Sequence, residues 1–354
     1  MTDRRRINGP SGGTIPPVFA SSITGSKLQH AARPTRTRGP NDLRKIFLKT
    51  GLVPSASGSA YLELEPSSPS DTLEASLIAP PSALKLTCTV HGPRPLPRSA
   101  PFSPHLLLST HVKFAPFAAR QRRSYIRDAS ERDLGVHLET ALRGVILGDR
   151  WPKSGVEVVI TVLEGEEDRW WGDEVGGGST GIGNVGGWGM MNVLAGCITV
   201  ASAAIADAGI DCVDLVSGGI AAIVKAPQEH NEDKTGSISE SLQLVLDPCP
   251  SEHRRIVGAC VVGYLASRDE ITELWLKGDI PPSSYDTKDP GQTTVGLEKL
   301  VDGAVIAAGR SCLVLREALK EAAELKLNPS GGPAVSDENK GQSSGPDEAM
   351  DLGS

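Results

Sequence analysis

Five basic residues occupy positions where they could bind phosphate groups. One follows the end of a predicted strand, a second ends the next strand, and three crowd the connection after it: Arg94, Lys113, Arg120, Arg122 and Arg123. Lysine binds phosphate by charge, and arginine adds a planar fork of donors. The cluster predicts contact with a nucleic-acid backbone. A solvated loop, partly paired with Asp128 and Glu131, is the alternative.

A glycine-rich stretch contains two formal catalytic motifs. Residues 181–186 fit GxGxxG, a dinucleotide-binding pattern, and residues 177–181 fit GxSxG, with Ser179 as the nucleophile. Both motifs need a strand directly before the turn, whereas the preceding predicted strand ends at Leu163. We therefore interpret both as chance matches. A nucleotide-binding enzyme that uses residues 177–186 remains an alternative.

The cysteines predict neither a disulfide framework nor a metal site. Six cysteines are scattered through apolar stretches without a CxxC pair, which indicates reduced thiols in an intracellular protein. Cys249 and His253 are spaced as a zinc pair, but a second pair is missing. We predict no metal and no cofactor.

Charge is distributed unevenly along the 354 residues. The net charge is −7, yet the first 50 residues carry ten basic and two acidic residues. Residues 329–354 carry five acids and one lysine. We predict a disordered basic arm over 1–41 and a disordered acidic tail over 329–354, on either side of one domain over 42–328.

The elements that must position these residues alternate between strands and helices. Pro-, Ser- and Gly-rich composition predicts insertions at about 65–84, 165–189 and 226–240. Hydrophobic periodicity predicts strands at 59–64, 85–91, 106–114, 156–163, 212–216, 219–224, 242–246, 255–266 and 271–276, with helices at 128–147, 190–208 and 294–325. The fold class that follows is α/β, as an α+β layered domain with long loop insertions.

Two of the helices carry further signals. Ser130 and Asp133 have the spacing of a capping box at the start of the 128–147 helix. Residues 190–206 carry no charge, but they are rich in small residues and lack basic flanks. A buried core helix is therefore predicted there rather than a membrane span.

Several segments in order resemble the RNase PH family, and within it the eukaryotic exosome ring subunits of the mRNA-transport-regulator class, with insertions of a fungal type. The segments lie at 42–44, 47–53, 58–63, 90–94, 114–117, 127–135, 152–164, 203–209 and 215–218. The resemblance covers roughly residues 42–326 without the insertions. It implies a fold of paired βαβα units and a ring of six related subunits with RNA in its central channel.

The resemblance also shows where this chain departs from active members. They degrade RNA from its 3′ end by phosphate attack, and hold phosphate with a Gly-Gly and a Thr-Arg just before the small-residue helix. Here no Lys or Arg occurs between Arg169 and Lys225. Active members also carry a second Asp six residues after a Leu-Asp. Here Asp247 is followed at that distance by His253, which cannot replace a carboxylate at a magnesium site.

These losses predict a non-catalytic structural and RNA-channel subunit of the exosome core. The expected partners are other RNase PH-like ring subunits, RNA-binding cap subunits and single-stranded RNA, with no membrane. The expected location is the nucleus and nucleolus, and also the cytoplasm. An active phosphorolytic 3′-to-5′ exoribonuclease that uses Asp247 is the main alternative.

Overall fold

A computed structural model describes residues 34–66, 83–119, 128–168, 187–225, 242–280 and 296–327. Several predictions fall outside these ranges. They include the glycine motifs at 177–186, the acidic tail and three of the basic candidates, Arg120, Arg122 and Arg123.

Two β-sheets form the framework. The first has the strand order β1-β2-β3-β5-β4 and is antiparallel except where β4 pairs with β5. Its strands are β1 (Ile46–Thr50), β2 (Gly58–Leu64), β3 (Lys85–Pro95), β4 (Leu107–Phe114) and β5 (Ser154–Glu164). The second sheet has the order β7-β6-β8-β9 and is wholly antiparallel. Its strands are β6 (Val216–Lys225), β7 (Leu242–Leu246), β8 (Ile256–Leu265) and β9 (Glu270–Gly278).

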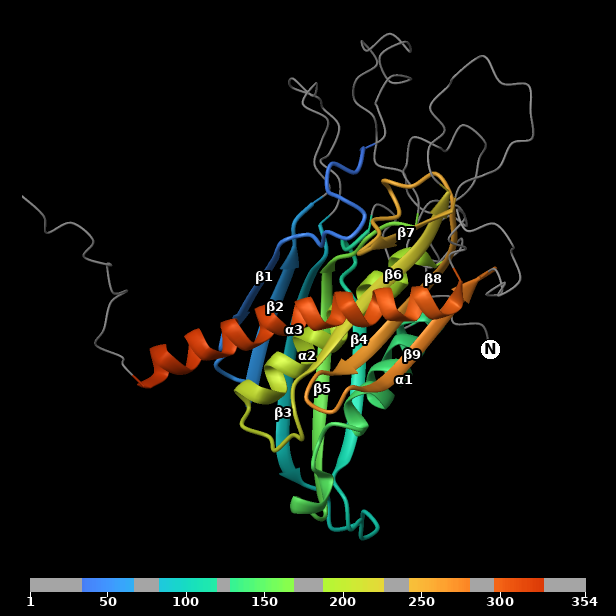
Figure 1. The fold of residues 1–354 in the computed structure, drawn as a ribbon. Coiled ribbons are helices and arrows are strands. Elements are labelled where there is room, and N and C mark those ends of the chain that lie inside the picture. The colour runs from blue at the N-terminus through green and yellow to red at the C-terminus, as the bar shows by residue number, and fades with distance from the viewer. Residues whose placement is uncertain are drawn as a thin grey trace, which may run out of the picture.

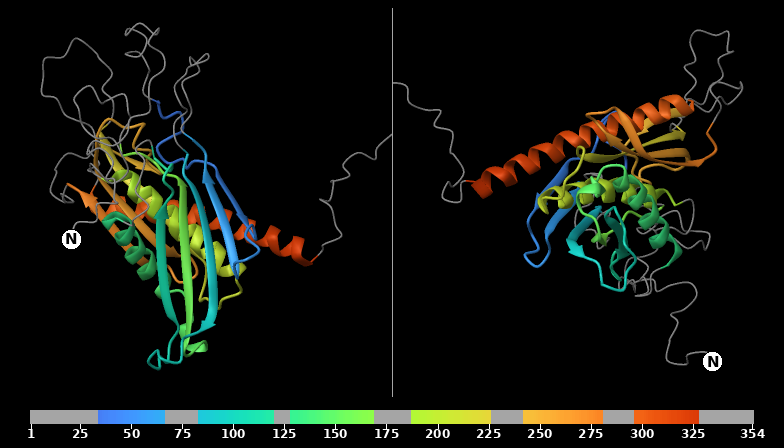
Figure 2. Two further views of the ribbon diagram at one scale, coloured as in Figure 1. Left: turned by 180° about the vertical axis from the view of Figure 1, so that it is seen from behind. Right: turned by 90° about the horizontal axis from the view of Figure 1, so that it is seen from below.

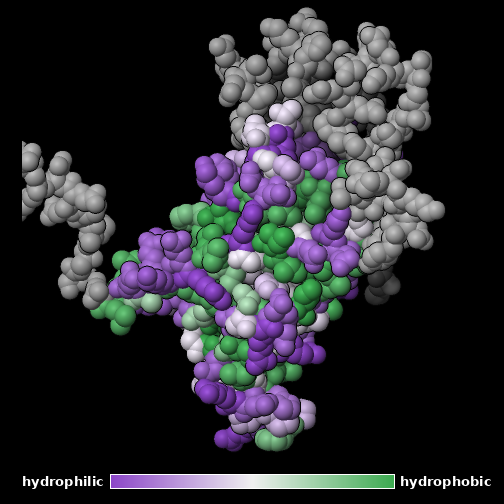
Figure 3. Space-filling view, viewed as in Figure 1, coloured by the Kyte–Doolittle hydropathy of each residue, from purple (hydrophilic) through white to green (hydrophobic). Residues whose placement is uncertain are grey.

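Three helices complete the layers. Helices α1 (Ala129–Arg143) and α2 (Trp188–Asp207) lie between the two sheets, and α3 (Leu297–Leu327) packs on the outer side of the second sheet (Figure 1). A short 3₁₀ turn, η2, spans Gly148–Arg150. Viewed from below, the order of layers is sheet, helices, sheet, helix (Figure 2). In the space-filling view, hydrophobic side chains lie beside α3 (Figure 3). The layered α/β class expected from the sequence is confirmed.

Alternation along the strands of the first sheet separates a core face from an outer face. In β5, Val156, Val158, Ile160 and Val162 are buried, while Glu157 between them is exposed. Antiparallel sheets tolerate such a division because one face can stay in water. No helix of the described ranges covers the outer face (Figure 2, left).

Helix α2 is the centre of the core. It is long and apolar enough to cross a membrane by length and composition alone, but 94% of its apolar window is buried inside the fold. It contacts β2 and β3 of the first sheet and β6 and β8 of the second. The core helix predicted for this segment is therefore what the structure contains.

Glycines set the distance between β6 and its two helices. A Cβ on Gly218 would lie 2.0 Å from the carbonyl oxygen of Ala195 in α2. A Cβ on the neighbouring Gly219 would lie 2.2 Å from the carbonyl oxygen of Ala304 in α3. Adjacent residues of a strand point to opposite faces, so this pair lets both helices approach β6 closely.

The structure corrects three local predictions. The capping box of α1 is formed by Asp128 and Glu131, not by Ser130 and Asp133. The Asp128 carboxylate accepts from the Glu131 backbone N–H at 2.9 Å, and the Glu131 carboxylate accepts from the Asp128 N–H at 3.2 Å. The predicted strand 212–216 is also wrong: Cys212 makes only an isolated bridge with Ile146, and β6 begins at Val216. Helix α1 ends at Arg143, before the predicted 147.

The glycine spacing makes a stability prediction with a matched control. Gly219→Ala forces a methyl group into the α3 backbone and is expected to lower the free energy of unfolding by about 2–3 kcal/mol. Gly309→Ala, in α3 where nothing lies within 4 Å of an added Cβ, is expected to raise it by about 0.5–1 kcal/mol through helix propensity. Urea unfolding of both variants measures the difference. Equal effects would contradict the close-approach account.

Candidate functional site

One arginine collects the polar groups at the end of the two-sheet core. Arg44 precedes β1, Glu166 follows β5 and Asp247 follows β7. The Arg44 Nε donates to Asp247 Oδ2 at 2.8 Å, and its Nη2 donates to Asp247 Oδ1 at 2.7 Å. Its Nη1 donates to Glu166 Oε1. The guanidinium therefore joins two carboxylates that are distant in sequence.

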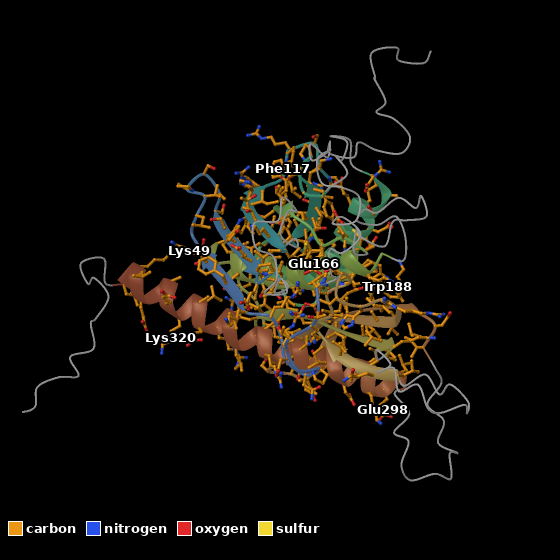
Figure 4. The ribbon with its side chains drawn as sticks, turned by 90° about the horizontal axis from the view of Figure 1, so that it is seen from above. Lys49, Phe117, Glu166, Trp188, Glu298 and Lys320 are labelled. Atoms are coloured by element: carbon orange, nitrogen blue, oxygen red, sulfur yellow. The ribbon has the colours of Figure 1, made fainter. Side chains whose placement is uncertain are left out.

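Glu166 lies near the middle of the molecule, between α3 and the first sheet (Figure 4). Its second oxygen accepts from the Asn192 side chain of α2. Asn192 also donates to the Pro248 carbonyl at 2.7 Å. These bonds bring α2, the end of β5 and the turn after β7 into one buried cluster, which we call the Arg44 cluster: Arg44, Glu166, Asn192 and Asp247.

Burial controls the ionisation of this cluster. Burial lowers the pKa of Arg44, but the charges of Asp247 and Glu166 outweigh it and the net shift is upward. Burial raises the pKa of the Asp247 carboxyl, but the charge and hydrogen bonds of Arg44 hold it well below the usual range. For Glu166 burial prevails and the pKa is raised. The guanidinium thus stabilises the charged form of Asp247 more than enough to offset burial, but for Glu166 it offsets burial only in part.

A second group of ion pairs lies beside the first. Arg38 Nη2 donates to Glu252 at 3.0 Å, and Arg36 approaches the same carboxylate at 3.8 Å. Arg36 also donates to the Leu246 carbonyl at 3.0 Å and to the Asp247 carbonyl at 3.2 Å. Residues 34–41, placed by composition in the basic arm, therefore lie against the turn that carries Asp247.

A carboxylate also occupies the N-terminus of α2. The Asp168 Oδ1 accepts from the Gly189 backbone N–H at 2.8 Å, and Asp168 is buried. A helix N-terminus attracts anions through its free N–H groups and its dipole. Here the chain supplies that anion itself. A phosphate approaching this end would meet Asp168 and, close behind it, Glu166.

The site residues predicted from the sequence do not form one cluster. Arg94 pairs in register with Gly155 at one end of β5, and Lys113 is level with Thr161 near the other end. Six residues of strand separate them by about 20 Å. Lys113 lies 3.4 Å from the Glu131 carboxylate, and the exposed Arg94 lies 3.4 Å from His91 Nδ1. The positions of Arg120, Arg122 and Arg123 lie outside the described ranges.

The structure describes both Asp247 and His253, the residue that stands where active members carry a second Asp. Asp247 is buried, and both of its oxygens accept from Arg44, including a 2.9 Å bond from the Arg44 backbone N–H. His253 is partly buried, directly after the buried Glu252. Within the described residues, no three His, Cys, Asp or Glu side chains are placed to share a metal ion. Cys249 Sγ lies 3.1 Å from Ser251 Oγ.

Sequence reasoning missed five residues of the site: Arg44, Glu166, Asp168, Asn192 and Glu252. Glu166 and Asp168 were included in the predicted insertion 165–189, although both are buried. Their partners lie far away in the sequence, so no local spacing marks them. The glycine motifs at 177–186 lie outside the described residues, between the end of β5 at Glu164 and the start of α2 at Trp188.

Comparison with known proteins decides the family. Residues 42–211 match the 3′ exoribonuclease family, domain 1 (RNase PH). The chain is 57% identical over 290 residues to the exosome complex component MTR3 of Chaetomium thermophilum, covering 81% of this chain and 90% of the relative. The chain belongs to the RNase PH family.

More distant relatives carry the same kind of name or share the fold. The chain is 30% identical to exosome complex component mtr3 of Schizosaccharomyces pombe, over 80% of this chain and 87% of the relative. For human exosome complex component MTR3 the identity is 26%, over 78% and 84%. Rice Rrp46 shares the fold, with a TM-score of 0.53, 15% identity and coverage of 80% of this chain and 98% of that one. The MTR3-type class and the RNase PH-like fold expected from the sequence are confirmed.

The Asp247 ion pair makes the stability of this RNase PH-family chain depend on pH. An aspartate in the unfolded chain has a pKa of about 3.9, and Asp247 has a lower pKa in the folded state. The unfolded state therefore binds the proton first as pH falls, so this stability is present above about pH 4 and is lost below it. Asp247→Asn is expected to flatten the fall in unfolding free energy between about pH 4 and pH 2.5.

Asp149→Asn is the control, because the Asp149 side chain is 86% exposed. Urea unfolding at several pH values measures each profile. An Asp247→Asn profile parallel to that of the unchanged chain would refute the ion-pair account.

Proposed function

We propose that this chain is a non-catalytic structural and RNA-channel subunit of the exosome core ring. It would assemble with other RNase PH-like chains and with RNA-binding cap subunits, and support 3′-to-5′ RNA processing and degradation in the nucleus and nucleolus and also in the cytoplasm. The printed names of its relatives support membership of the complex. The observation that carries the non-catalytic part is that both carboxylate oxygens of Asp247 accept hydrogen bonds from Arg44.

The Asp247 carboxylate is used in a buried ion pair, whereas an enzyme would need it free to transfer a proton or to bind a metal ion. A carboxylate that acts as a general acid needs a pKa near the working pH, and one that binds magnesium needs an accessible oxygen. The Arg44 guanidinium takes both oxygens and holds the Asp247 pKa low. Glu252, the other carboxylate of the same turn, is held by Arg38.

The phosphate position supports the same proposal. Phosphorolysis needs a cationic pocket for inorganic phosphate, since the attacking group is itself an anion. The N-terminus of α2 instead binds Asp168. Two cations lie near this helix end: Arg44 is shared between Glu166 and Asp247, and the Lys277 ammonium lies against Gly187, the N-cap residue of α2. The Asp168 carboxylate, which already accepts from the helix N-terminus, would repel phosphate there.

The full-length chain is expected to show no phosphate-dependent release of nucleoside diphosphates from the 3′ end of single-stranded RNA. In the assembled particle, Asp247→Ala is expected to leave the rate per assembled ring unchanged. Glu157→Ala, which removes an acid from the outer face of β5, is the charge-matched control. Release by the unchanged chain that disappears in Asp247→Ala alone would establish the active-enzyme alternative.

RNA contact is the second part of the proposal. Lys113, near the end of β4, offers charge for phosphate groups at one end of the first sheet, and Arg94 offers charge at the opposite end. Arg120, Arg122 and Arg123 follow Lys113 in the sequence and add to the charge proposed for its end. Since about 20 Å separates these ends, a short RNA segment contacts one of them at a time.

Charge-reversal variants test the two proposed RNA contacts separately. Changing Arg120, Arg122 and Arg123 to glutamate is expected to weaken single-stranded RNA binding by the assembled ring at least about tenfold and to lower the salt dependence of binding. Arg94→Glu changes one charge of the same sign at the other end and reports on that end alone. Unchanged affinity and salt dependence in the triple variant would refute this contact.

A further inference from the structure

A small cavity adjoins the Arg44 cluster. It has a volume of about 40 Å³ and lies between β1 and β2 of the first sheet, helix α2, strand β6 and helix α3. Three members of the cluster, Arg44, Asn192 and Asp247, contribute to its wall. Most of the remaining wall is apolar, and its hydroxyl groups belong to Thr199 of α2 and Ser311 of α3. The cavity is therefore a mainly apolar space with a few polar groups.

The side-chain oxygen of Asn192 is a buried acceptor that needs a donor. Asn192 is 2% exposed, and its Nδ2 donates to the Glu166 carboxylate and to the Pro248 carbonyl. The Pro248 carbonyl can only accept, so the amide cannot be turned to place its oxygen there. No group among the described residues donates to Asn192 Oδ1. Because a buried acceptor without a donor loses its hydration uncompensated, this oxygen favours a donor in the neighbouring cavity.

The two hydroxyl groups in the wall already donate their hydrogens elsewhere. Thr199 Oγ1 donates to a carbonyl one turn earlier in α2 at 3.1 Å and accepts from the Gly218 N–H at 3.0 Å. Ser311 Oγ donates to the Ala307 carbonyl at 3.1 Å, which leaves its acceptor lone pairs for the cavity. The cavity thus presents two acceptors, the Asn192 oxygen and the Ser311 hydroxyl, to a molecule inside it.

Size and charge decide which molecule fits. A water molecule needs about 10–15 Å³, so the cavity has room for about three, whereas a cavity that binds benzene has about 150 Å³. The acceptors and the nearby carboxylates of Asp247 and Glu166 oppose an anion, and the Arg44 guanidinium in the wall opposes a cation. Water is neutral, small enough and carries two O–H donors, so it matches the cavity.

We propose that this cavity binds a cluster of ordered water molecules, one of which donates to Asn192 Oδ1 and, directly or through a second water, to Ser311 Oγ. This inference does not depend on the proposed ring function. It links the Arg44 cluster to α3, because Asn192 belongs to α2 and Ser311 to α3. Buried waters of this kind make about three hydrogen bonds and are part of the structure.

A crystal structure of the full-length chain with its ordered waters located tests the site directly. Water density is expected at about 2.7–2.8 Å from Asn192 Oδ1, the usual distance of an O–H donor. Xenon enters dry apolar cavities, so xenon pressurised into the same crystals is expected to stay out of this one. A cavity without water density, or one that holds xenon, would overturn the inference.

Nuclear magnetic resonance of the full-length chain, labelled at its alanine methyl groups, gives a readout in solution. Ala307 lies in the cavity wall, whereas Ala304 of the same helix is also buried but does not line the cavity. The Ala307 methyl is expected to show a nuclear Overhauser contact with water, and the Ala304 methyl, as the matched control, is expected to show none.

Ser311→Ala separates bound water from magnetisation that passes through the serine hydroxyl. The variant removes that hydroxyl and leaves Asn192 in place, so the contact between the Ala307 methyl and water is expected to persist. Loss of the contact in Ser311→Ala, or its absence from the unchanged chain, would overturn the inference. Neither result bears on the proposed ring function, because ring assembly is not measured.

Discussion

The buried guanidinium of Arg44 is the interaction on which the rest of the site depends. It is bonded to Asp247 through two nitrogens and its backbone N–H, and to Glu166 through a third nitrogen. Removing two carboxylates and a guanidinium from water is costly, and a low-dielectric site repays that cost only when the geometry satisfies each charge. Loss of Arg44 would leave two buried carboxylates without their cation, and loss of Asp247 would leave Arg44 with Glu166 as its one partner in the cluster. The cluster therefore restricts how the segment before β1, the ends of β5 and β7, and helix α2 can be arranged.

Under the proposed non-catalytic role, this arrangement explains how an RNase PH fold keeps its shape without the chemistry. The position of the carboxylate is retained as Asp247, but its oxygens are used for internal bonding. The helix N-terminus is retained in α2, but it binds Asp168. Both groups still connect the two sheets through the helix between them, which the glycine contacts of β6 hold at close range. In this chain these polar atoms are bonded to one another.

Periodicity and composition predicted most elements of the fold, because these elements follow local patterns, but they missed β1 and placed a false strand at 212–216. The alternation in β5, the apolar stripe of α3 and the uncharged α2 each follow from neighbouring residues. The site was predictable only in part. Asp247 was found because a family pattern marked it, whereas Arg44 and Glu166 bond to partners 203 and 122 residues away. The α1 cap was misassigned within a few residues, because Asp128 and Ser130 both have side chains that can cap and only the backbone geometry chooses between them.

The central claim is that Asp247 acts through Arg44 as a structural bond, and a double-mutant cycle measures this directly. Arg44→Met and Asp247→Leu are each expected to lower the free energy of unfolding by about 3–5 kcal/mol, because the first removes the cation of two buried carboxylates and the second removes the carboxylate that Arg44 bonds through two nitrogens. The double variant is expected to cost at least about 2 kcal/mol less than the sum of the single losses. Losses that add to within about 0.5 kcal/mol would show that the two side chains act independently, and would contradict the account.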